Sequence, residues 1–202
     1  MAIKLGESKN IIVGASVVWI GTAAAVKPAV VAGTSYNATL SALNGVGWRN
    51  AGFTQEGVEF SNEPEFTGVQ VDQLLDDAKQ VKTGISNSIN TTFAEATFEN
   101  LLVVWGQSDG TLTTTSGVST LNIVSGELGE APQERQLIVV GNGREGAAGY
   151  NERAYHFKRA ISVESSSFAQ RRSEATVFPV SFRLLPDDNG SYGTFTERAR
   201  TW

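Results

Sequence analysis

The feature that most constrains this chain is a period-two alternation of apolar and polar residues in its last third. It runs through 155–164 and 176–184. Successive side chains of a strand point to opposite faces, so the pattern predicts strands with one buried face. Pro179 interrupts the second run and cannot donate a ladder hydrogen bond, which predicts an edge position or a bulge. The apolar residues that share a face are Tyr155, Phe157, Ile161 and Val163 in the first run, and Phe178, Val180, Phe182 and Leu184 in the second.

Turn-forming residues divide the remainder of the chain into short runs. Of 202 residues, 21 are glycine, many of them beside Asn, Asp or Ser. An apolar run rich in Val and Ile covers 11–20, and alternating runs cover 56–61 and 84–93. Short strands separated by turns predict an all-β sandwich or barrel. The length fits a single domain over 1–202 that can bury a sizeable core.

One segment, 92–105, carries a helical pattern. Thr92 and Glu95 fit a capping box, in which each side chain satisfies a free backbone amide. Apolar residues follow at 98, 101, 102 and 105 as one stripe, and Gly106 is a plausible stop. We therefore expect one helix that covers an open end or face of the sheets. No second segment has a comparable pattern, and 71–79 comes nearest to one.

Composition limits the chemistry that this chain can perform. It has no cysteine, which excludes disulfides, thiolate zinc sites and thiol nucleophiles. It has one histidine, His156, on the polar side of its alternating run, where we expect a surface or interface residue. The net charge of -5 argues against a nucleic-acid binder with a basic face. We predict a protein that is not an enzyme, with no catalytic site, no metal site and no cofactor.

Charge is unevenly distributed along the chain. Seven acids and no base lie in 56–77, whereas ten bases lie in 135–200. Such runs are commonly solvated faces. They also suit complementary surfaces on two copies of the chain, where opposite charge orients a head-to-tail contact.

One glycine motif imitates a nucleotide-binding fingerprint. Residues 141–146 read Gly-Asn-Gly-Arg-Glu-Gly after a strand-like run, and Glu164 follows at a distance suited to a ribose contact. The fingerprint requires a helix to begin at these glycines. Because the alternating run starts at Tyr155, only about eight residues remain for that helix, so a glycine-rich hairpin explains the motif better.

Three further patterns have a structural as well as a functional interpretation. The run Asp-Asp-Asn-Gly at 187–190 imitates a calcium loop but lacks spaced ligands and a closing glutamate, so we expect a turn. The acids of 56–65 would suit a glycosidase pair, although acids close together on one strand commonly face solvent. The four tryptophans would suit a sugar-binding surface, a core or subunit contacts. They are Trp19, Trp48, Trp105 and Trp202.

The N-terminus imitates a secretory signal peptide, since lysines precede the apolar run 11–20. Glu7 in the basic region and the glycines within the run argue against that interpretation. The run is also shorter than the roughly 20 residues that span a bilayer. We expect a buried strand here and no membrane insertion.

Four stretches carry a resemblance to a known family. Residues 17–23 form a first strand that ends in a Gly-Thr turn, and 48–60 run from a tryptophan through Gly-Phe and Glu-Gly-Val into a strand. Residues 83–101 form a strand that leads into the helix, and 178–186 form the final strand. On these stretches the chain resembles the major tail proteins, or tail tube proteins, of phages with long non-contractile tails, especially those of actinobacterial hosts.

The resemblance implies a β-sandwich or β-barrel flanked by one helix, assembled as six copies in a ring. Stacked rings form a tube that holds the tape-measure protein and later conducts phage DNA. Inner strands of neighbouring copies form a continuous barrel, which removes exposed sheet edges. Arms link the rings, and the candidates here are 1–10, 106–126 and 194–202. The implied location is the virion tail, assembled in the host cytoplasm with other tail proteins.

Charge gives candidate residues for this assembly. An acidic lumen lets DNA slide, because basic phosphate contacts supply most non-specific affinity. We expect the basic strands to face neighbouring subunits. The lumen candidates are Glu63, Glu65, Asp72 and Asp76. The subunit-interface candidates are Arg153, Lys158, Arg159, Arg171 and Arg172.

Two other classes of function remain open at this stage. Another virion β-protein, such as a decoration or baseplate subunit, predicts trimers or isolated rings instead of long tubes. An extracellular carbohydrate-binding β-sandwich predicts a monomer whose tryptophan fluorescence shifts with glycan. An enzyme has no supporting cluster beyond the glycine motif.

Overall fold

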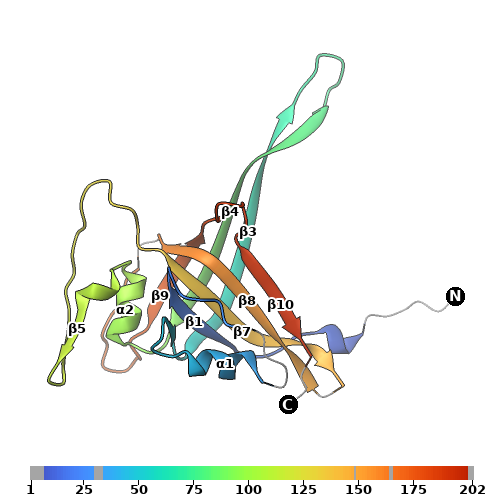
Figure 1. The fold of residues 1–202 in the computed structure, drawn as a ribbon. Helices are drawn as coiled ribbons and strands as arrows, with labels where there is room; N and C mark the ends of the chain where they lie inside the picture. Colours follow the sequence, from blue (N-terminus) through green and yellow to red (C-terminus); the bar gives the residue numbers. More distant parts are fainter. Residues whose placement is uncertain (1–6, 30–33, 148, 164–165, 200–202) are drawn as a thin grey trace.

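The structure, a computed structural model, describes residues 7–29, 34–147, 149–163 and 166–199. It confirms a mainly β fold with flanking helical segments (Figure 1). The strands are β1 (Ser16–Thr22), β2 (Trp48–Asn50), β3 (Thr54–Val69), β4 (Lys79–Phe93), β5 (Leu112–Thr115), β6 (Val118–Leu121), β7 (Arg135–Gly146), β8 (Gly149–Ser162), β9 (Phe178–Leu184) and β10 (Gly193–Arg198). The helices are α1 (Tyr36–Ala42) and α2 (Phe98–Val104), with 3-10 turns η1 (Ser8–Asn10) and η2 (Asp109–Thr111).

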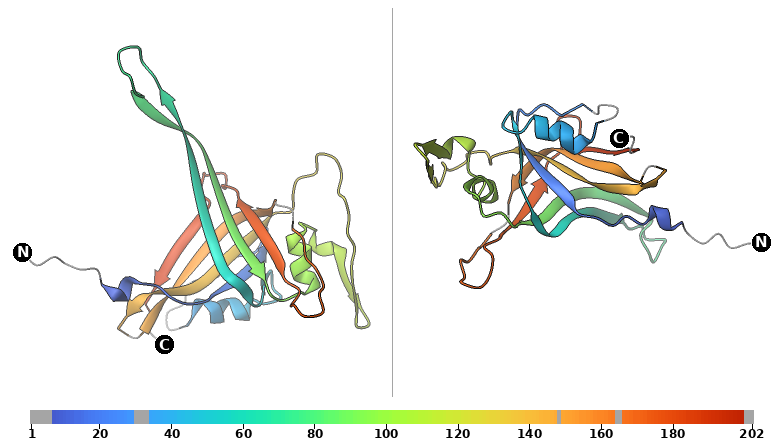
Figure 2. Two further views of the ribbon diagram at one scale, coloured as in Figure 1. Left: turned by 180° about the vertical axis from the view of Figure 1, so that it is seen from behind. Right: turned by 90° about the horizontal axis from the view of Figure 1, so that it is seen from below.

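Most strands belong to one antiparallel sheet. Its order is β2-β1-β7-β8-β9-β4-β3, and β10 pairs with the first half of β8. Of strand β8, only the last residues, Ala160–Ser162, pair with β9. The sheet therefore divides along β8, and the part made of β9, β4 and β3 folds over the face of β1, β7 and β8 (Figure 2). Strands β5 and β6 form a separate hairpin beside α2 (Figure 1).

The main core lies between the two parts of this bent sheet. Alternating side chains of β1, β7 and β8 face those of β4 and β9, and α2 closes one end of the layer. The predicted shared face of β9 is confirmed, because Phe178, Val180, Phe182 and Leu184 are all buried. Around Pro179, β9 pairs with β4 alone, so the missing proline donor lies at a local edge, as predicted.

A second core covers the opposite face of β1, β7 and β8. Helix α1 packs its buried residues Tyr36 and Leu40 there, together with Trp48 of β2. The Ser35 hydroxyl caps the helix, and the carboxylate of Glu152 on β8 accepts the Tyr36 amide at 2.6 Å. Seven residues of weak pattern thus become a helix because a sheet face and a carboxylate hold them.

His156 is buried, with 4% of its surface exposed, so the expected surface histidine is wrong. The predicted alternation holds as far as Phe157, but α1 and Trp48 cover the face that it assigned to solvent. The register with β7 shifts after Phe157, so Ala160 and not Ile161 joins the main core, and Val163 is 49% exposed; the predicted shared face is wrong at these two positions. The His156 Nε2 atom lies 3.0 Å from Oε1 of Gln136. Burial, and then the charges of Lys27 and Lys158, lower the pKa of His156 to about 4.

The predicted flanking helix exists but begins later than expected. Thr92 belongs to β4, and the helix starts at Phe98 with Thr97 as its N-cap. The Thr97 hydroxyl accepts a hydrogen bond from the backbone N–H of Asn100 at 3.2 Å. The Glu95 carboxylate instead accepts the amide of Phe53 at 3.0 Å. Pairing with β3 and β9 extends the strand to Phe93, inside the predicted capping box.

The apolar run 11–20 is only partly a strand. Strand β1 begins at Ser16, whereas Ile11 and Val13 are 66% and 70% exposed, so the expected buried strand over the whole run is wrong. The pairing between β1 and β7 begins at Ser16, so residues 11–15 have no partner in this ladder. Among the described residues, neither helix has the length and apolar character needed to cross a bilayer.

Candidate functional site

The most prominent feature of the molecule is the hairpin of β3 and β4. The two strands pair from Thr54 and Phe93 at the base to Val69 and Lys79 near the tip. Strand β9 pairs with β4 only as far as Ser88, so beyond that point no third strand of the described residues joins the hairpin. Its outer half consequently projects from the body (Figure 1).

The hairpin has two chemically different faces. Residues opposite each other in an antiparallel pair share a face. On one face Glu59, Ser61, Glu63 and Glu65 lie opposite Asn90, Ser88, Ser86 and Gly84. On the other, Phe60, Asn62 and Pro64 lie opposite Ile89, Asn87 and Ile85. As far as Glu65 the first face is polar, whereas the second begins in the core and is partly apolar. Beyond the register shift that follows Glu65, both faces mix apolar and polar residues.

The four lumen candidates all lie on this hairpin. Glu63 and Glu65 are exposed on the polar face of β3. Asp72 and Asp76 are exposed in the turn that joins the strands, where the Asp76 carboxylate accepts the Asp77 amide at 2.8 Å. The segment 71–79, the weak candidate for a second helix, therefore forms the hairpin turn and the first residue of β4. The acids gather on one projecting element.

Arg153 is one of the five interface candidates and lies in an ion cluster at one end of β8. Its Nε donates to Oε2 of Glu197 at 2.9 Å, and Arg144 contacts the other carboxylate oxygen at 2.8 Å. Asn151 donates to the same carboxylate at 3.1 Å. The hydrogen bond from Arg153 is the main cause that lowers the pKa of Glu197. This cluster fastens β10 to β8.

Lys158 and Arg159 lie at the other end of β8 and are also paired. Lys158 contacts the carboxylate of Asp187, and Nε of Arg159 donates to Glu134 at 2.7 Å. These contacts hold the pKa of both carboxyl groups below the ordinary range. Both cations keep 38% of their side-chain surface exposed, so they remain accessible to another chain.

Arg171 and Arg172 lie in an exposed turn before β9. Arg171 pairs with Glu174 at 2.7 Å, and both side chains are more than half exposed. An exposed pair of this kind contributes little to stability, about 0–1 kcal/mol. Neither residue packs in the body of the subunit.

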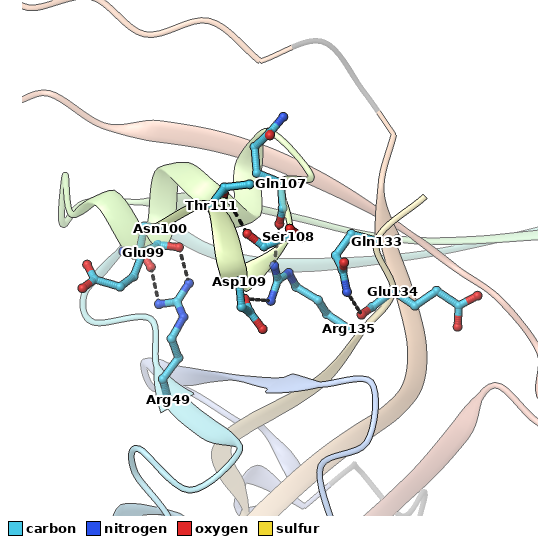
Figure 3. Close-up of polar contacts among 10 residues, drawn as sticks. All are labelled: Arg49, Glu99, Asn100, Gln107, Ser108, Asp109, Thr111, Gln133, Glu134 and Arg135. Atoms are coloured by element: carbon cyan, nitrogen blue, oxygen red, sulfur yellow. Dashed lines mark hydrogen bonds and ion pairs between the residues drawn. The ribbon is translucent and has the colours of Figure 1, made fainter. Parts of the chain in front are cut away.

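Two arginines attach α2 and the segment after it to the body (Figure 3). Arg49 donates to the Asn100 side chain at 2.8 Å and to the Glu99 carbonyl at 2.7 Å. Arg135, with 4% of its surface exposed, donates to Asp109 and to the Gln107 carbonyl. Burial, and then the charge of Arg135, lower the pKa of Arg49 to about 10. The sequence carries no signal that pairs these distant residues.

The predicted arms differ in their local structure. The segment 106–126 contains η2 and the hairpin of β5 and β6, which agrees with the predicted loop or hairpin. Residues 194–198 lie in β10 and pair with β8. Residues 7–10 hold the 3-10 turn η1, and 1–6 and 200–202 lie outside the described residues.

Comparison with known proteins decides the family. The model of the family described as "Phage tail tube protein" matches residues 4–199. The chain belongs to the phage tail tube protein family. A search of curated proteins found none similar to it. The predicted resemblance is thereby confirmed, and the hairpin and the ion clusters are features of a structural tail tube protein.

The sequence features that imitate other functions have structural roles in this tail tube protein. Residues 141–146 lie at the end of β7 and turn directly into β8, so no helix follows the glycines. Asp187 closes a turn by accepting the amides of Asn189 and Ser191, as predicted for that segment. Among the described residues no group of His, Asp and Glu is arranged to hold a metal ion.

The tryptophans do not form a sugar-binding surface in the part of the chain that the structure describes. Trp19 and Trp48 are each 2% exposed and donate their indole N–H groups to Asn37 and to the Val26 carbonyl. Trp105 packs against Phe168, with ring centroids 6.0 Å apart. Trp202 lies outside the described residues.

Proposed function

We propose that this protein assembles with copies of itself into stacked hexameric rings that form the tail tube, the conduit through which the phage genome leaves the virion. The observation that carries the proposal is the free edge of β3. This strand has sixteen residues, and its only sheet neighbour among the described residues is β4. A long exposed edge presents unpaired backbone groups and invites pairing with another chain.

Ring closure satisfies this edge. A heterologous contact, in which one surface of a copy meets a different surface of the next, forms a ring when the rotation closes. Pairing of β3 with a strand of the next copy extends the sheet around the ring and leaves no subunit with an open edge. The candidates Arg153, Lys158, Arg159, Arg171 and Arg172 then contribute contacts to neighbouring subunits.

The polar face of the hairpin suits the lumen. Serine, asparagine and glutamate side chains cover it, and Glu63 and Glu65 lie in its exposed half. Asp72 and Asp76 extend the same negative charge to the tip. Between Glu59 and Glu65 the two strands of the hairpin place no cation on this face, and the two lysines of β4, Lys79 and Lys82, lie nearer the tip. That part of the face gives DNA no phosphate contacts, so the genome passes without being held. The tape-measure protein occupies the same lumen before ejection, and assembly takes place in the host cytoplasm.

Electron microscopy of the purified protein tests the assembly. Long tubes built from rings of six subunits are the expected result. Trimers or isolated rings alone would refute the proposal and favour a decoration or baseplate role. Subunits that stay monomeric at high concentration would also refute it.

Charge reversal tests the lumen. Tubes of the variant Glu63→Lys/Glu65→Lys should bind DNA at low salt and release it as salt rises, because each new phosphate contact adds to the salt dependence. The matched control is Glu127→Lys/Glu130→Lys, which reverses two exposed acids on the loop after β6. If both variants retain DNA equally, or if neither variant retains it, these acids do not line the bore.

A further inference from the structure

Residues 23–29, which follow β1, form a strap over the second core. No strand of the described residues pairs with this strap, and side chains hold it instead by its carbonyl groups. The indole N–H of Trp48 donates to the Val26 carbonyl at 2.8 Å. The Tyr36 hydroxyl donates to the Pro28 carbonyl at 3.2 Å. The closed position of the strap therefore depends on a few side-chain hydrogen bonds.

Gln136 of β7 connects the strap to His156. Its Nε2 donates to the carbonyls of Ala23 and Ala25, at 3.1 and 2.6 Å. Because a carbonyl group can only accept a hydrogen bond, the orientation of the Gln136 amide is fixed, and its Oε1 lies 3.0 Å from Nε2 of His156. An amide oxygen also only accepts, so Nε2 of His156 must carry the proton of the neutral ring.

The other ring nitrogen of His156 is consequently a buried acceptor. In a neutral imidazole one nitrogen carries a proton and the other a lone pair, so the lone pair lies on Nδ1. This Nδ1 atom is buried and has no hydrogen-bond partner among the described residues. A proton added there would create a buried cation with two donors and one acceptor, which is strongly unfavourable. The ring can therefore take up a proton only where it reaches water.

The charges that act on the ring are both positive. They belong to Lys27 of the strap and Lys158 of β8, and both disfavour a proton on the ring. Lys158 itself pairs with Asp187. Helix α1 contains no charged residue, and its one titratable side chain is Tyr36. The neighbours of the ring on β2, β7 and β10 are uncharged, and they are Trp48, Gln136 and Thr194.

The strap is the part of this cover that opens most easily. Strands β7 and β10 are each joined to β8 by a ladder of backbone hydrogen bonds. The strap has only its side-chain bonds, including the one from Nζ of Lys27 to Oγ1 of Thr194 at 2.7 Å. Local opening favours segments with few backbone hydrogen bonds, so water reaches His156 at the lowest cost when the strap lifts.

We propose that residues 23–29 form an acid-sensitive strap, which leaves the sheet when His156 takes up a proton at Nδ1. The strap belongs to a single subunit, so this inference stands apart from the proposed assembly. Burial, and then the two lysines, lower the pKa of His156 to about 4 in the closed form, against about 6.5 in water. The equilibrium constant for opening should therefore rise about a hundredfold between pH 7 and pH 4.

NMR of isotope-labelled subunits tests the ring directly, because the chain has one histidine and its signals need no further assignment. The ring nitrogen shifts should place the proton on Nε2 at pH 7 and show a titration midpoint near 4. Amide exchange, corrected for its intrinsic pH dependence, reports on the strap through Ala25, whose N–H bonds to the Thr22 carbonyl at 3.0 Å. Ala25 should lose protection between pH 7 and pH 4, whereas Ile138, in β7 between β1 and β8, should keep it. A proton on Nδ1 at pH 7, or an Ala25 amide that stays protected while His156 titrates, would overturn the inference.

Two variants separate the histidine from the carboxylates that also respond to acid. His156→Gln keeps a donor for Gln136 but takes up no proton, so Ala25 should stay protected at pH 4. The matched control is Glu152→Gln, which changes an acid of the same strand that accepts the amides of Tyr36 and Asn37. This control should still open in acid. Opening in His156→Gln, or its loss in Glu152→Gln, would show that a group other than His156 drives the strap.

If His156→Gln does not fold, Tyr36→Phe decides. It removes one bond of the strap and leaves His156 and Gln136 unchanged. Because coupling between two sites is reciprocal, a looser strap must make proton uptake easier. The titration midpoint of His156 should rise by about half a pH unit to one unit, as the loss of one hydrogen bond implies. In the control Tyr150→Phe, at a position 40% exposed, the midpoint should not move. Equal midpoints in Tyr36→Phe and the wild type would refute the link between strap and histidine.

Discussion

Asn100 offers the sharpest test of how the flanking helix is held. It is 1% exposed and joins α2 to the segment between β2 and β3. Its Nδ2 donates to the carbonyls of Ala51 and Glu95, at 2.8 and 2.9 Å, and its Oδ1 accepts from Arg49 at 2.8 Å. The substitution Asn100→Ala removes all three hydrogen bonds, so the two carbonyl groups and the Arg49 guanidinium lose this partner.

The cost follows from the groups left behind. A net hydrogen bond contributes about 1 kcal/mol, and a bond to a charged group about 1.5–3 kcal/mol. Two neutral bonds and the bond from Arg49 then sum to about 4 kcal/mol, plus a small cavity. For a chain of this size about 1 kcal/mol lowers the Tm by about 2–4 °C, so the Tm should fall by about 10 °C.

The assay is urea unfolding of dilute subunits, followed by circular dichroism. Asn189→Ala is the matched control, because Asn189 is exposed and its side chain makes no hydrogen bond within the described residues. It should change the free energy of unfolding by less than about 0.5 kcal/mol. A loss below about 1 kcal/mol in Asn100→Ala would refute the argument that these three bonds anchor the helix.

Two further predictions concern the core and pH. Phe182 is 1% exposed in the main core, so Phe182→Ala should lower the free energy of unfolding by about 3–5 kcal/mol, as measured by urea unfolding. The control Pro179→Ala, at an exposed position of the same strand, should have little effect. The pKa of His156 is about 4 in the folded state, below the ordinary value of about 6.5. Between these two pH values the unfolded state binds a proton that the folded state does not, so the free energy of unfolding should fall by about 3 kcal/mol as pH drops from 6.5 to 4. His156→Gln should remove that part of the slope, and an unchanged slope would show that His156 is not buried in its neutral form.

Local patterns predicted much of the fold. The alternation in 155–164 and 176–184 specified strands β8 and β9, because the period of two is a property of the extended backbone itself. The glycine motif at 141–146 belongs to the hairpin of β7 and β8, as predicted, although its residues lie in strand β7 itself. The segment 187–190 forms the predicted turn. In each case the residues that carry the signal are neighbours in the chain.

Three of the errors have one physical origin, which is pairing or packing with segments that are distant in the sequence. Thr92 lies in a strand because β3 and β9 pair on both sides of it, and the helix begins only after that pairing ends at Phe93. Helix α1 has a weak pattern and forms because a sheet face and the Glu152 carboxylate hold it. His156 is buried because that helix and Trp48 cover its strand.

The candidate residues show the same division. By sequence alone the acids at 56–77 form one negative run, and their chemical suitability for a DNA conduit follows from charge. Only the structure divides them between the face of a strand and the tip of a projecting hairpin. The basic candidates appear free in the sequence, yet Arg153, Lys158, Arg159 and Arg171 each pair with an acid of the same chain.

The sequence by itself determined the β class, the turns, the acidic character and the family of this protein, because these depend on residue identity and spacing along the chain. The tertiary structure decided that β3 and β4 leave the body as a long two-faced hairpin, since β9 stops pairing with β4 at Ser88. It also decided that Leu74 and Leu75 lie exposed at the tip of this hairpin. Which surfaces are exposed depends on contacts between distant segments, and those are set only when the sheet bends over its core.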